Sequence, residues 1–362
     1  MSSPTPRPGI LDIDLYVGGK SALDGQGPVI KLSSNEGALG PSPKAVAAYR
    51  EVAGALHLYP DIGSTELREA IAAQHGLDPA GIVCGNGSDE LLSLLAKGYA
   101  GPGDEVIITE HGFAMYPIVT LAAGATPVTA SERGLAADVD AILDRVTAKT
   151  RMVFLASPNN PTGSYVPRDE LSRLRAALRE DVLLVVDAAY AEYISREDYT
   201  DGADLVESGD NVVMTRTFSK AYALAALRLG WAYCPPSVAG VLNRMRIPFN
   251  VTLPAQAAGT AAVNDVAHRE AGRAHNDVWL PWFAQQLSGL GLEPAPSVAN
   301  FVLVRFPDDR AKCADAAEKF LNGRGIIPRA VASYGLPESL RITIGREEDM
   351  KTVIAALGEF MG

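Results

Sequence analysis

Apolar and polar residues follow two alternating patterns along most of the chain. Short apolar runs rich in valine and isoleucine, typical of buried strands, occur at 105–109, 151–155, 182–186 and 211–215. Between them lie segments with helical spacing, such as 168–178 and 65–74, the latter with Ser64 as its expected N-cap. Because buried strands alternate with helices, the pattern predicts an α/β fold with a mostly parallel sheet covered on both faces.

The two ends of the chain show a different pattern. Before Pro43, glycine, proline and serine are frequent, and the short apolar piece 29–32 predicts an isolated strand. After Thr252 come one long alanine-rich helical region and then mixed strands and helices. These segments are 254–287, 300–306, 311–322, 340–344 and 347–360. We therefore expect a large cofactor-binding domain of residues 44–253, and a smaller α+β domain that joins residues 1–43 to residues 254–362.

Charge argues against two classes of partner. Of the 362 residues, 43 are acidic and 32 are basic, which gives a net charge of −11. Such a surface repels nucleic acid and anionic membranes. The least charged stretch, 113–130, contains Pro117, Gly124 and Pro127, so we interpret it as helix, turn and strand rather than a membrane span.

Cysteine and histidine spacing predicts a cytoplasmic protein without a metal site. The first nine residues lack the apolar segment of a secretory signal. The three cysteines are Cys84, Cys234 and Cys313. Their odd number and wide separation favour a reduced compartment, and no zinc spacing occurs. His268 and His275 are expected on a polar helix face.

Two ionisable residues follow predicted buried strands. Lys220 comes after hydroxyl-bearing residues at 215–219, in apolar surroundings. Burial lowers the pKa of a lysine and makes it a nucleophile or a Schiff-base amine, although an ordinary surface lysine at a helix start has the same local pattern. Asp187 ends the run 182–186. A carboxylate there needs a cation, such as a protonated pyridine nitrogen, or else caps a helix.

Two loops add weaker signals. Residues 157–163 contain two prolines and a glycine, which indicate a rigid loop or simply a turn. Residues 84–90 are rich in glycine and lead into a helical segment. Free backbone N–H groups at a helix start bind phosphate, but this loop matches neither of the common nucleotide-binding loops.

Together these four segments resemble the fold-type I pyridoxal-phosphate enzymes, and most closely the histidinol-phosphate aminotransferase family. The resemblance extends to 15–21, 32–36, 59–61 and 340–345, in the family's order. It implies the fold-type I architecture, with a mostly parallel sheet in the large domain. It also implies pyridoxal 5'-phosphate as the cofactor.

The resemblance further implies roles for residues around the cofactor ring. Lys220 would bind the cofactor covalently, and Asp187 would pair with the pyridine nitrogen and keep it protonated. Asn160 and Tyr190 would bond to the ring hydroxyl oxygen. Phe113 would stack on the ring.

The same resemblance implies a phosphate site and a homodimer. The phosphate would be held by the backbone of Ser88 and Asp89, the hydroxyls of Thr217 and Ser219, and the guanidinium of Arg228. Tyr59 would reach the phosphate of the neighbouring subunit. Shared active sites in a homodimer follow from that contact.

Substrate residues are implied in the smaller domain. Arg341 would bind the donor's anionic group and the carboxylate of the 2-oxo acid, with Asn300 supporting it. Tyr16 and Asn35 would lie near the substrate. Arg341, Tyr16 and Asn35 match positions of the family. Lys351, in contrast, stands where the family usually has a second phosphate-binding arginine, and the neighbouring Arg346 could compensate for the lost bidentate contact.

The implied reaction is ping-pong transamination between L-histidinol phosphate and 2-oxoglutarate, in histidine biosynthesis. Lys220 would move the proton between the substrate carbon and the cofactor carbon. Two related reactions remain open from the residues, namely transamination of phenylalanine or tyrosine and a phosphothreonine-type decarboxylation. A non-catalytic protein that keeps the fold is disfavoured by Lys220, Asp187 and Arg228.

Overall fold

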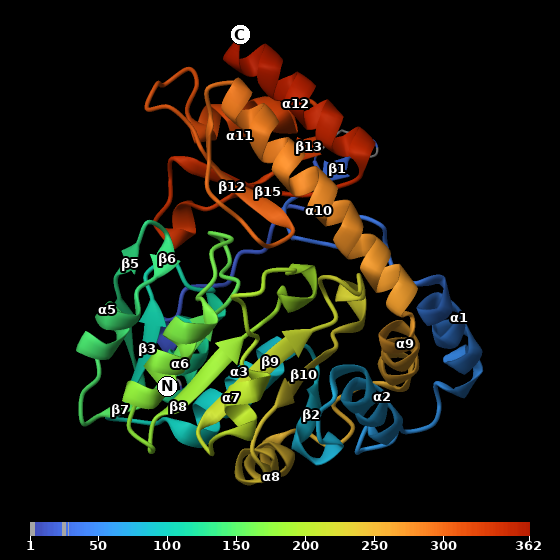
Figure 1. Ribbon diagram of the computed structural model, residues 1–362, viewed down its shortest axis with the longest axis vertical. Coiled ribbons are helices and arrows are strands. Elements are labelled where there is room, and N and C mark those ends of the chain that lie inside the picture. Colours follow the sequence, from blue (N-terminus) through green and yellow to red (C-terminus); the bar gives the residue numbers. More distant parts are fainter. Residues whose placement is uncertain (1–3, 24–26, 28) are drawn as a thin grey trace.

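A seven-stranded sheet forms the centre of the protein in this computed structural model, which describes residues 4–23, 27 and 29–362. The strand order is β2-β10-β9-β8-β7-β3-β4 (Figure 1). The strands are β2 (Ile82–Gly85), β3 (Glu105–Thr109), β4 (Thr126–Ala130), β7 (Thr150–Ala156), β8 (Leu183–Asp187), β9 (Val212–Thr217) and β10 (Gly230–Tyr233). Only β10 runs antiparallel to its neighbours. The mostly parallel sheet predicted from the sequence is confirmed.

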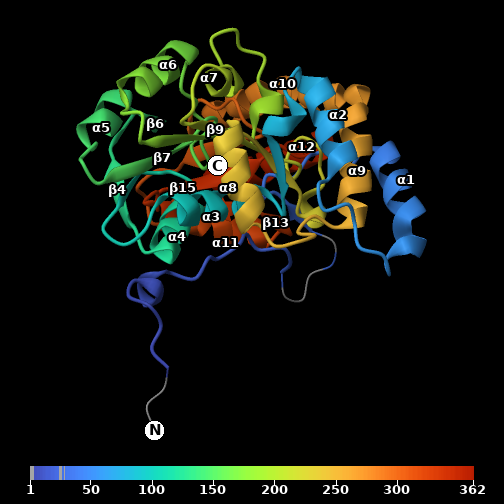
Figure 2. The same cartoon turned by 90° about the horizontal axis from the view of Figure 1, so that it is seen from below.

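Helices cover both faces of this sheet, because its central strands are apolar on both sides (Figure 2). On one face pack α2 (Thr65–His75), α5 (Val139–Asp144), α6 (Arg168–Ala177), α7 (Ala203–Glu207) and α9 (Leu253–Asn264). On the other pack α3 (Ser88–Tyr99), α4 (Met115–Ala123) and α8 (Pro236–Met245). Consecutive residues of β7 alternate between the two cores, with Val153 in the first and Phe154 in the second. The predicted α/β class is therefore confirmed.

The start of α2 differs in one detail from the expectation. The helix begins after Ser64, as the pattern predicts, but the Ser64 side chain makes no capping bond. The Asp61 carboxylate instead accepts from the backbone N–H groups of Gly63 at 3.0 Å and Thr65 at 2.6 Å. These bonds lower the pKa of Asp61. The capping acceptor thus lies three residues before Ser64.

A smaller antiparallel sheet has the order β11-β12-β15-β14. Its strands are β11 (Glu293–Pro294), β12 (Phe301–Arg305), β14 (Arg329–Ala330) and β15 (Ser339–Thr343). The helices α10 (Val266–Gly289), α11 (Ala314–Asn322) and α12 (Glu347–Met361) share its apolar core. Further elements are α1 (Pro43–Glu51), the hairpin of β5 (Glu132–Arg133) and β6 (Ala136–Ala137), and short 3₁₀ turns such as η4 (Ala191–Tyr193).

The strand expected at 29–32 is present but is not isolated. β1 (Ile30–Lys31) pairs in parallel with β13 (Ile326–Ile327). Leu32 and Ile326 are both buried in the core of the smaller sheet, so burial of apolar side chains brings the two segments together. The pairing ties the N-terminal segment to the C-terminal part of the chain.

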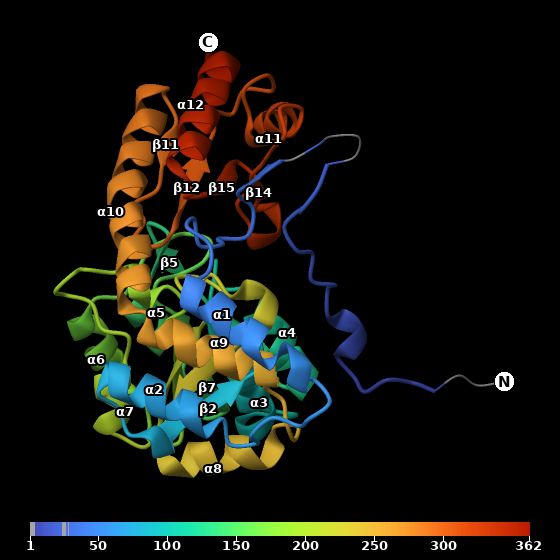
Figure 3. The same ribbon diagram turned by 90° about the vertical axis from the view of Figure 1, so that its right-hand side faces the viewer.

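The helical region 254–287 is two helices rather than one. The chain breaks at Asp265, whose carboxylate accepts from the Ser42 hydroxyl at 2.5 Å and pairs with Lys44 at 3.0 Å. Beyond the break, α10 runs from the larger sheet to the smaller one (Figure 3). α9 packs against α1 and α2, beside the larger sheet. The division of the chain into a large domain of residues 44–253 and a smaller domain of residues 1–43 and 254–362 remains a prediction.

The interpretation of 113–130 as helix, turn and strand is confirmed by α4, Gly124 at φ +89° and β4. Across the part of the chain that the structure describes, no helix has the length and apolar character needed to cross a membrane. Residues 1–3, which belong to the segment expected to lack a secretory signal, lie outside the described residues.

Candidate active site

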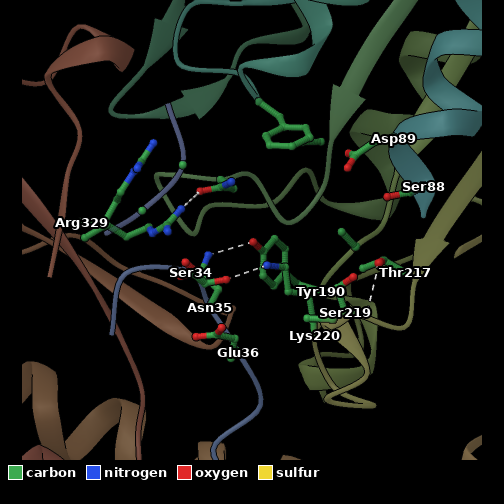
Figure 4. Close-up of a pocket in the computed structure, with 18 of the residues that line it drawn as sticks. Ser34, Asn35, Glu36, Ser88, Asp89, Tyr190, Thr217, Ser219, Lys220 and Arg329 are labelled. Atoms are coloured by element: carbon green, nitrogen blue, oxygen red, sulfur yellow. Dashed lines mark hydrogen bonds between the residues drawn. The ribbon is translucent and has the colours of Figure 1, made fainter. Parts of the chain in front are cut away.

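A cavity of about 340 Å³ lies where the carboxyl ends of β7, β8 and β9 meet the smaller sheet and the N-terminal segment. In parallel α/β sheets this edge is the usual place for ligands. Thirteen predicted site residues line it, namely Tyr16, Asn35, Ser88, Asp89, Phe113, Asn160, Asp187, Tyr190, Thr217, Ser219, Lys220, Arg228 and Arg341. Figure 4 shows Ser34 and Asn35 beside Lys220 and Tyr190, to which dashed hydrogen bonds join them.

Asp187 is the last residue of β8 and is only 4% exposed. Its carboxylate accepts from the hydroxyls of Tyr116 at 2.9 Å and Thr215 at 3.2 Å. Burial raises the pKa of Asp187 to about 6. Within the described residues no lysine, arginine or histidine pairs with this carboxylate, and it caps no α-helix. A cationic ligand group would supply the missing partner.

Lys220 lies inside the cavity and is not a surface lysine. Its Nζ donates to the backbone carbonyl of Ser34 at 2.9 Å. Burial, followed by the charge of Arg341, lowers the pKa of Lys220 to about 8. A substantial fraction of the amine is therefore neutral near pH 7.5, as a nucleophile or a general base requires.

An anion-binding corner surrounds the first turn of α3. The helix starts at Ser88, directly after Gly87 at φ +79°. The Arg228 guanidinium bonds to the hydroxyl of Ser219 at 3.3 Å and to the carboxylate of Asp89 at 3.1 Å. The positive φ of Gly87 favours glycine, and a Cβ there would also lie 2.6 Å from Arg228 Nη2. Helix N–H groups, hydroxyls and a guanidinium together suit a phosphate dianion.

Arg341 adds a further guanidinium group to the cavity. It is 5% exposed, and its guanidinium donates to the Ser33 carbonyl at 2.6 Å and to Asn160 Oδ1. Its Nε has no hydrogen-bond partner. Asn35 Nδ2 donates to the Tyr190 hydroxyl at 2.9 Å. An anionic substrate group would satisfy the remaining donor capacity of this buried guanidinium.

Three predicted site residues lie outside the cavity. Tyr59 is 81% exposed and stacks on Phe249, with ring centroids 4.5 Å apart. Arg346 is the N-cap of α12, and its Nε donates to the Ala38 carbonyl at 3.4 Å. Lys351 pairs with Glu347 one turn away on the exposed side of α12. The structure does not bring these three side chains to the other site residues.

Asn300 lies beside the site and bonds to the backbone of the N-terminal segment. Its side chain does not bond to Arg341. Its Nδ2 donates to the backbone carbonyls of Asn35 at 3.1 Å and Glu36 at 3.3 Å. The expected support of Arg341 is therefore not a bond between the two side chains, and it stays a prediction.

Some site residues were missed by the sequence reasoning. The structure shows that Tyr116 donates a hydrogen bond to the Asp187 carboxylate. Further residues that line the cavity are Ser33, Ser34, Glu36, Arg329 and Tyr334. Tyr116 belongs to the same segment as Phe113, so that motif carried a usable signal. The two serines act through backbone carbonyls, which leave no signal in the residue type. Arg329 and Tyr334 lie in a segment without a motif.

Comparisons with known proteins agree with this geometry. A family model for aminotransferase class I and II matches residues 27–357. Histidinol-phosphate aminotransferases from Paramagnetospirillum magneticum and Rhodospirillum centenum are 61% and 56% identical over 362 and 361 residues, covering 100% of this chain and 100% and 99% of theirs. The crystal structure of histidinol-phosphate aminotransferase from Sinorhizobium meliloti in complex with pyridoxal-5'-phosphate is 28% identical, with a TM-score of 0.90 over 99% of this chain and 98% of that one. The fold is therefore fold-type I, and the chain belongs to the class I and II aminotransferase family.

Proposed function

We propose that this protein transfers the amino group of L-histidinol phosphate to 2-oxoglutarate in histidine biosynthesis, with pyridoxal 5'-phosphate as its cofactor. The observation that carries the proposal is one cavity that combines a buried amine, a buried carboxylate without a cationic partner and three guanidinium groups. Identity of 53–61% over the full chain to three histidinol-phosphate aminotransferases supports the choice of donor.

The residues present fit the cofactor. The corner of Ser88, Asp89, Thr217, Ser219 and Arg228 suits its phosphate, and the unpaired carboxylate of Asp187 suits its protonated ring nitrogen. We assign Asn160 and Tyr190 to its ring hydroxyl and Phe113 to its ring face. When bound, pyridoxal phosphate supplies an electron sink for the charge that develops at the substrate carbon.

We assign the proton transfer to Lys220. Its Nζ would take the proton from the substrate carbon and return it later, which is general base and general acid catalysis by one amine. The lowered pKa of about 8 supports this role, since both protonation states are populated near neutral pH. Repetition of the sequence in reverse with 2-oxoglutarate completes the ping-pong cycle.

We assign the anionic groups of both substrates to the arginine side of the cavity. Arg341 has an unpartnered Nε, and Arg329 also lines the cavity, with its Nη2 donating to the Val17 carbonyl at 2.7 Å. In Figure 4, Arg329 lies on the opposite side of the cavity from Ser88 and Thr217. Guanidinium groups match phosphate and carboxylate alike, so one subsite serves both substrates. We assign Tyr16, 53% exposed, and Asn35 to the rim of this subsite.

The donor is tested by single half-reactions of the cofactor-loaded enzyme with histidinol phosphate, phenylalanine and tyrosine. The absorbance of the bound cofactor reports each conversion. We expect histidinol phosphate to give the highest kcat/KM, because its phosphate has more charge and one more acceptor oxygen for the guanidinium groups than the carboxylate of phenylalanine or tyrosine. A higher kcat/KM for phenylalanine or tyrosine would replace the proposed donor with an aromatic amino acid.

Lys351 gives a second prediction, since its assignment to the donor phosphate has no support in the geometry. Lys351 pairs with Glu347 and lies outside the cavity. Lys351→Ala is therefore expected to leave the KM for histidinol phosphate unchanged. The KM is measured beside that of Arg341→Ala, for which we expect a large increase. A comparable increase for Lys351→Ala would restore the sequence-based assignment.

The homodimer is part of the same proposal. Tyr59 stacks on Phe249, and Leu56, Leu58 and Ile247, which are close to these two residues in sequence, are exposed apolar side chains as well. Exposed apolar patches of this kind mark protein interfaces. A second copy covering this patch would place Tyr59 beside the partner's cofactor phosphate.

We also propose a cytoplasmic location, supported by three free cysteines spread widely along the chain.

A further inference from the structure

Two consecutive carbonyl groups hold the two cationic side chains that the reaction uses. The carbonyl of Ser33 accepts from Arg341 Nη2 at 2.6 Å, and the carbonyl of Ser34 accepts from Lys220 Nζ at 2.9 Å. We call residues 33–37 the crossing segment, because it passes between the two sheets (Figure 3). The position of this backbone therefore determines where the Arg341 guanidinium and the Lys220 amine form these hydrogen bonds.

The crossing segment has an unusual conformation that needs support. Asn35 is 1% exposed and has φ +56°, a left-handed conformation uncommon outside glycine. Thr343 Oγ1 accepts from the Asn35 backbone N–H at 2.9 Å. On its other side, a Cβ built on Gly37 would lie 2.9 Å from the Lys220 carbonyl. The segment thus packs tightly against the loop that carries the lysine.

The carbonyl groups that follow Ser34 are held by one side chain. Asn300 Nδ2 donates to the carbonyls of both Asn35 and Glu36. Asn300 is 2% exposed, and its own carbonyl accepts from the Ile344 N–H at 2.8 Å, which fixes its backbone to the end of β15. An amide N–H₂ can serve two carbonyl acceptors at once, which neither an aliphatic side chain nor a carboxylate can do.

We propose that Asn300 is a positioning residue for the aminotransferase reaction. By holding the carbonyls of Asn35 and Glu36, it keeps the carbonyls of Ser33 and Ser34 where Arg341 and Lys220 bond to them. Asn300 precedes β12 in the smaller sheet, whereas Lys220 follows β9 in the larger one. One side chain therefore sets the relative position of the anion-binding group and the proton-transferring group. This inference rests on the proposed function of the cavity.

Asn211 offers a closely matched control. It is 6% exposed, directly precedes a strand as Asn300 does, and donates through Nδ2 to two backbone carbonyls, those of Arg179 and Val182. The Oδ1 atoms of both asparagines lack a partner. Asn211, however, lies at the amino end of β9, away from the cavity. Loss of either amide should therefore affect folding similarly, and only one should affect the site.

The test compares Asn300→Ala with Asn211→Ala in the cofactor-loaded enzyme. For Asn300→Ala we expect kcat/KM for both substrates to fall about 100-fold, as a displacement near 1 Å of reacting groups does. We also expect a shifted pH profile of the bound cofactor's absorbance and slower cofactor uptake by the apo-protein, two readouts that do not depend on the donor. For Asn211→Ala we expect a similar loss of thermal stability, but wild-type values of kcat/KM, of the pH profile of absorbance and of the rate of cofactor uptake.

Equal effects of the two substitutions on catalysis, absorbance and uptake would overturn the proposal, since Asn300 would then be only structural. Asn300→Ser, a milder change that retains a hydroxyl donor, answers the same question if the alanine variant does not fold. The wild-type enzyme is assayed first with histidinol phosphate. Failure at that step concerns the proposed donor alone, because absorbance and cofactor uptake still test the role of Asn300.

Discussion

Replacing Lys220 with alanine is expected to stop repeated turnover while leaving a folded protein that still binds pyridoxal phosphate through the Arg228 corner. Lys220 is the one lysine among the described residues that line the cavity, so no other amine can transfer the proton. Loss of a positioned general acid and base lowers the rate by up to about 10⁴-fold. Lys220→Arg should not restore it, because a guanidinium stays protonated and cannot act as a base.

The same substitution should change how the apo-protein's stability depends on pH. Burial lowers the pKa of Lys220 from its ordinary 10.5 to about 8, so the unfolded chain binds more protons between these values. Wild-type stability should therefore rise as pH increases from 8 to 10.5, whereas Lys220→Ala lacks this contribution. The stabilisation of the variant over the wild type should be largest below pH 8 and should vanish towards pH 10.5.

Steady-state turnover and apo-protein melting temperatures measure the two effects. Lys319→Ala is the matched control, because Lys319 is an exposed lysine on α11 that pairs with Asp315. Its bond to Asp315 raises the pKa of Lys319, so its own effect falls above pH 10.5. Lys319→Ala should therefore leave turnover and the change in stability between pH 8 and 10.5 as in the wild type. Sustained multiple turnover by Lys220→Ala would remove Lys220 from the proton-transfer step.

The central sheet was predictable because its strands are buried on both faces. Runs such as 182–186 contain only apolar residues, and periodicity alone then indicates a strand between helices. β2 and β10 were missed, since they are four residues long and contain Gly85 and Gly230. The break at Asp265 was missed for another reason. It depends on the Ser42 hydroxyl, 223 positions away, which no local pattern records.

The cofactor side of the cavity was easier to predict than the substrate side. Asp187 and Thr217 each end a strand, so chain order already places them at one edge of the sheet. The substrate side is assembled from irregular segments and backbone atoms. Ser34 contributes a backbone carbonyl, which every residue type has, so its residue type gives no signal. Lys351 was assigned to the substrate only from the family resemblance, and its side chain pairs with Glu347 on the exposed side of α12, outside the cavity.

Replacing Asp187 with asparagine should make the apo-protein more stable and the enzyme much less active. Burial raises the pKa of Asp187 from 3.8 to about 6, so the folded state binds more protons than the unfolded state between these values. Stability therefore falls as pH rises through this window. Above pH 6 the charged carboxylate destabilises the apo-protein by about 3 kcal/mol, since each unit of pKa shift corresponds to about 1.36 kcal/mol.

Asparagine at this position has a similar shape but no charge. The Tyr116 and Thr215 hydroxyls bond to different carboxylate oxygens. In asparagine one of them still donates to Oδ1, and the other hydroxyl turns to accept from the Nδ2 group. We expect Asp187→Asn to melt at a higher temperature than the wild type at pH 7.5. The difference should shrink as pH falls from 6 towards 4, where the wild-type carboxyl is protonated too. Asp315→Asn, an exposed substitution on α11, should show no comparable pH-dependent gain.

Activity should change in the opposite direction. Asp187→Asn removes the carboxylate that we assign to the protonated ring nitrogen, and the loss of one preorganised electrostatic group lowers kcat by about 100-fold or more. Affinity for pyridoxal phosphate should fall as well. A buried charge that serves catalysis at a cost in stability predicts this combination, in which the substitution raises stability and lowers activity. Wild-type kcat, or a lower melting temperature of the apo-variant at pH 7.5, would instead make Asp187 a structural residue whose hydroxyl partners already satisfy it.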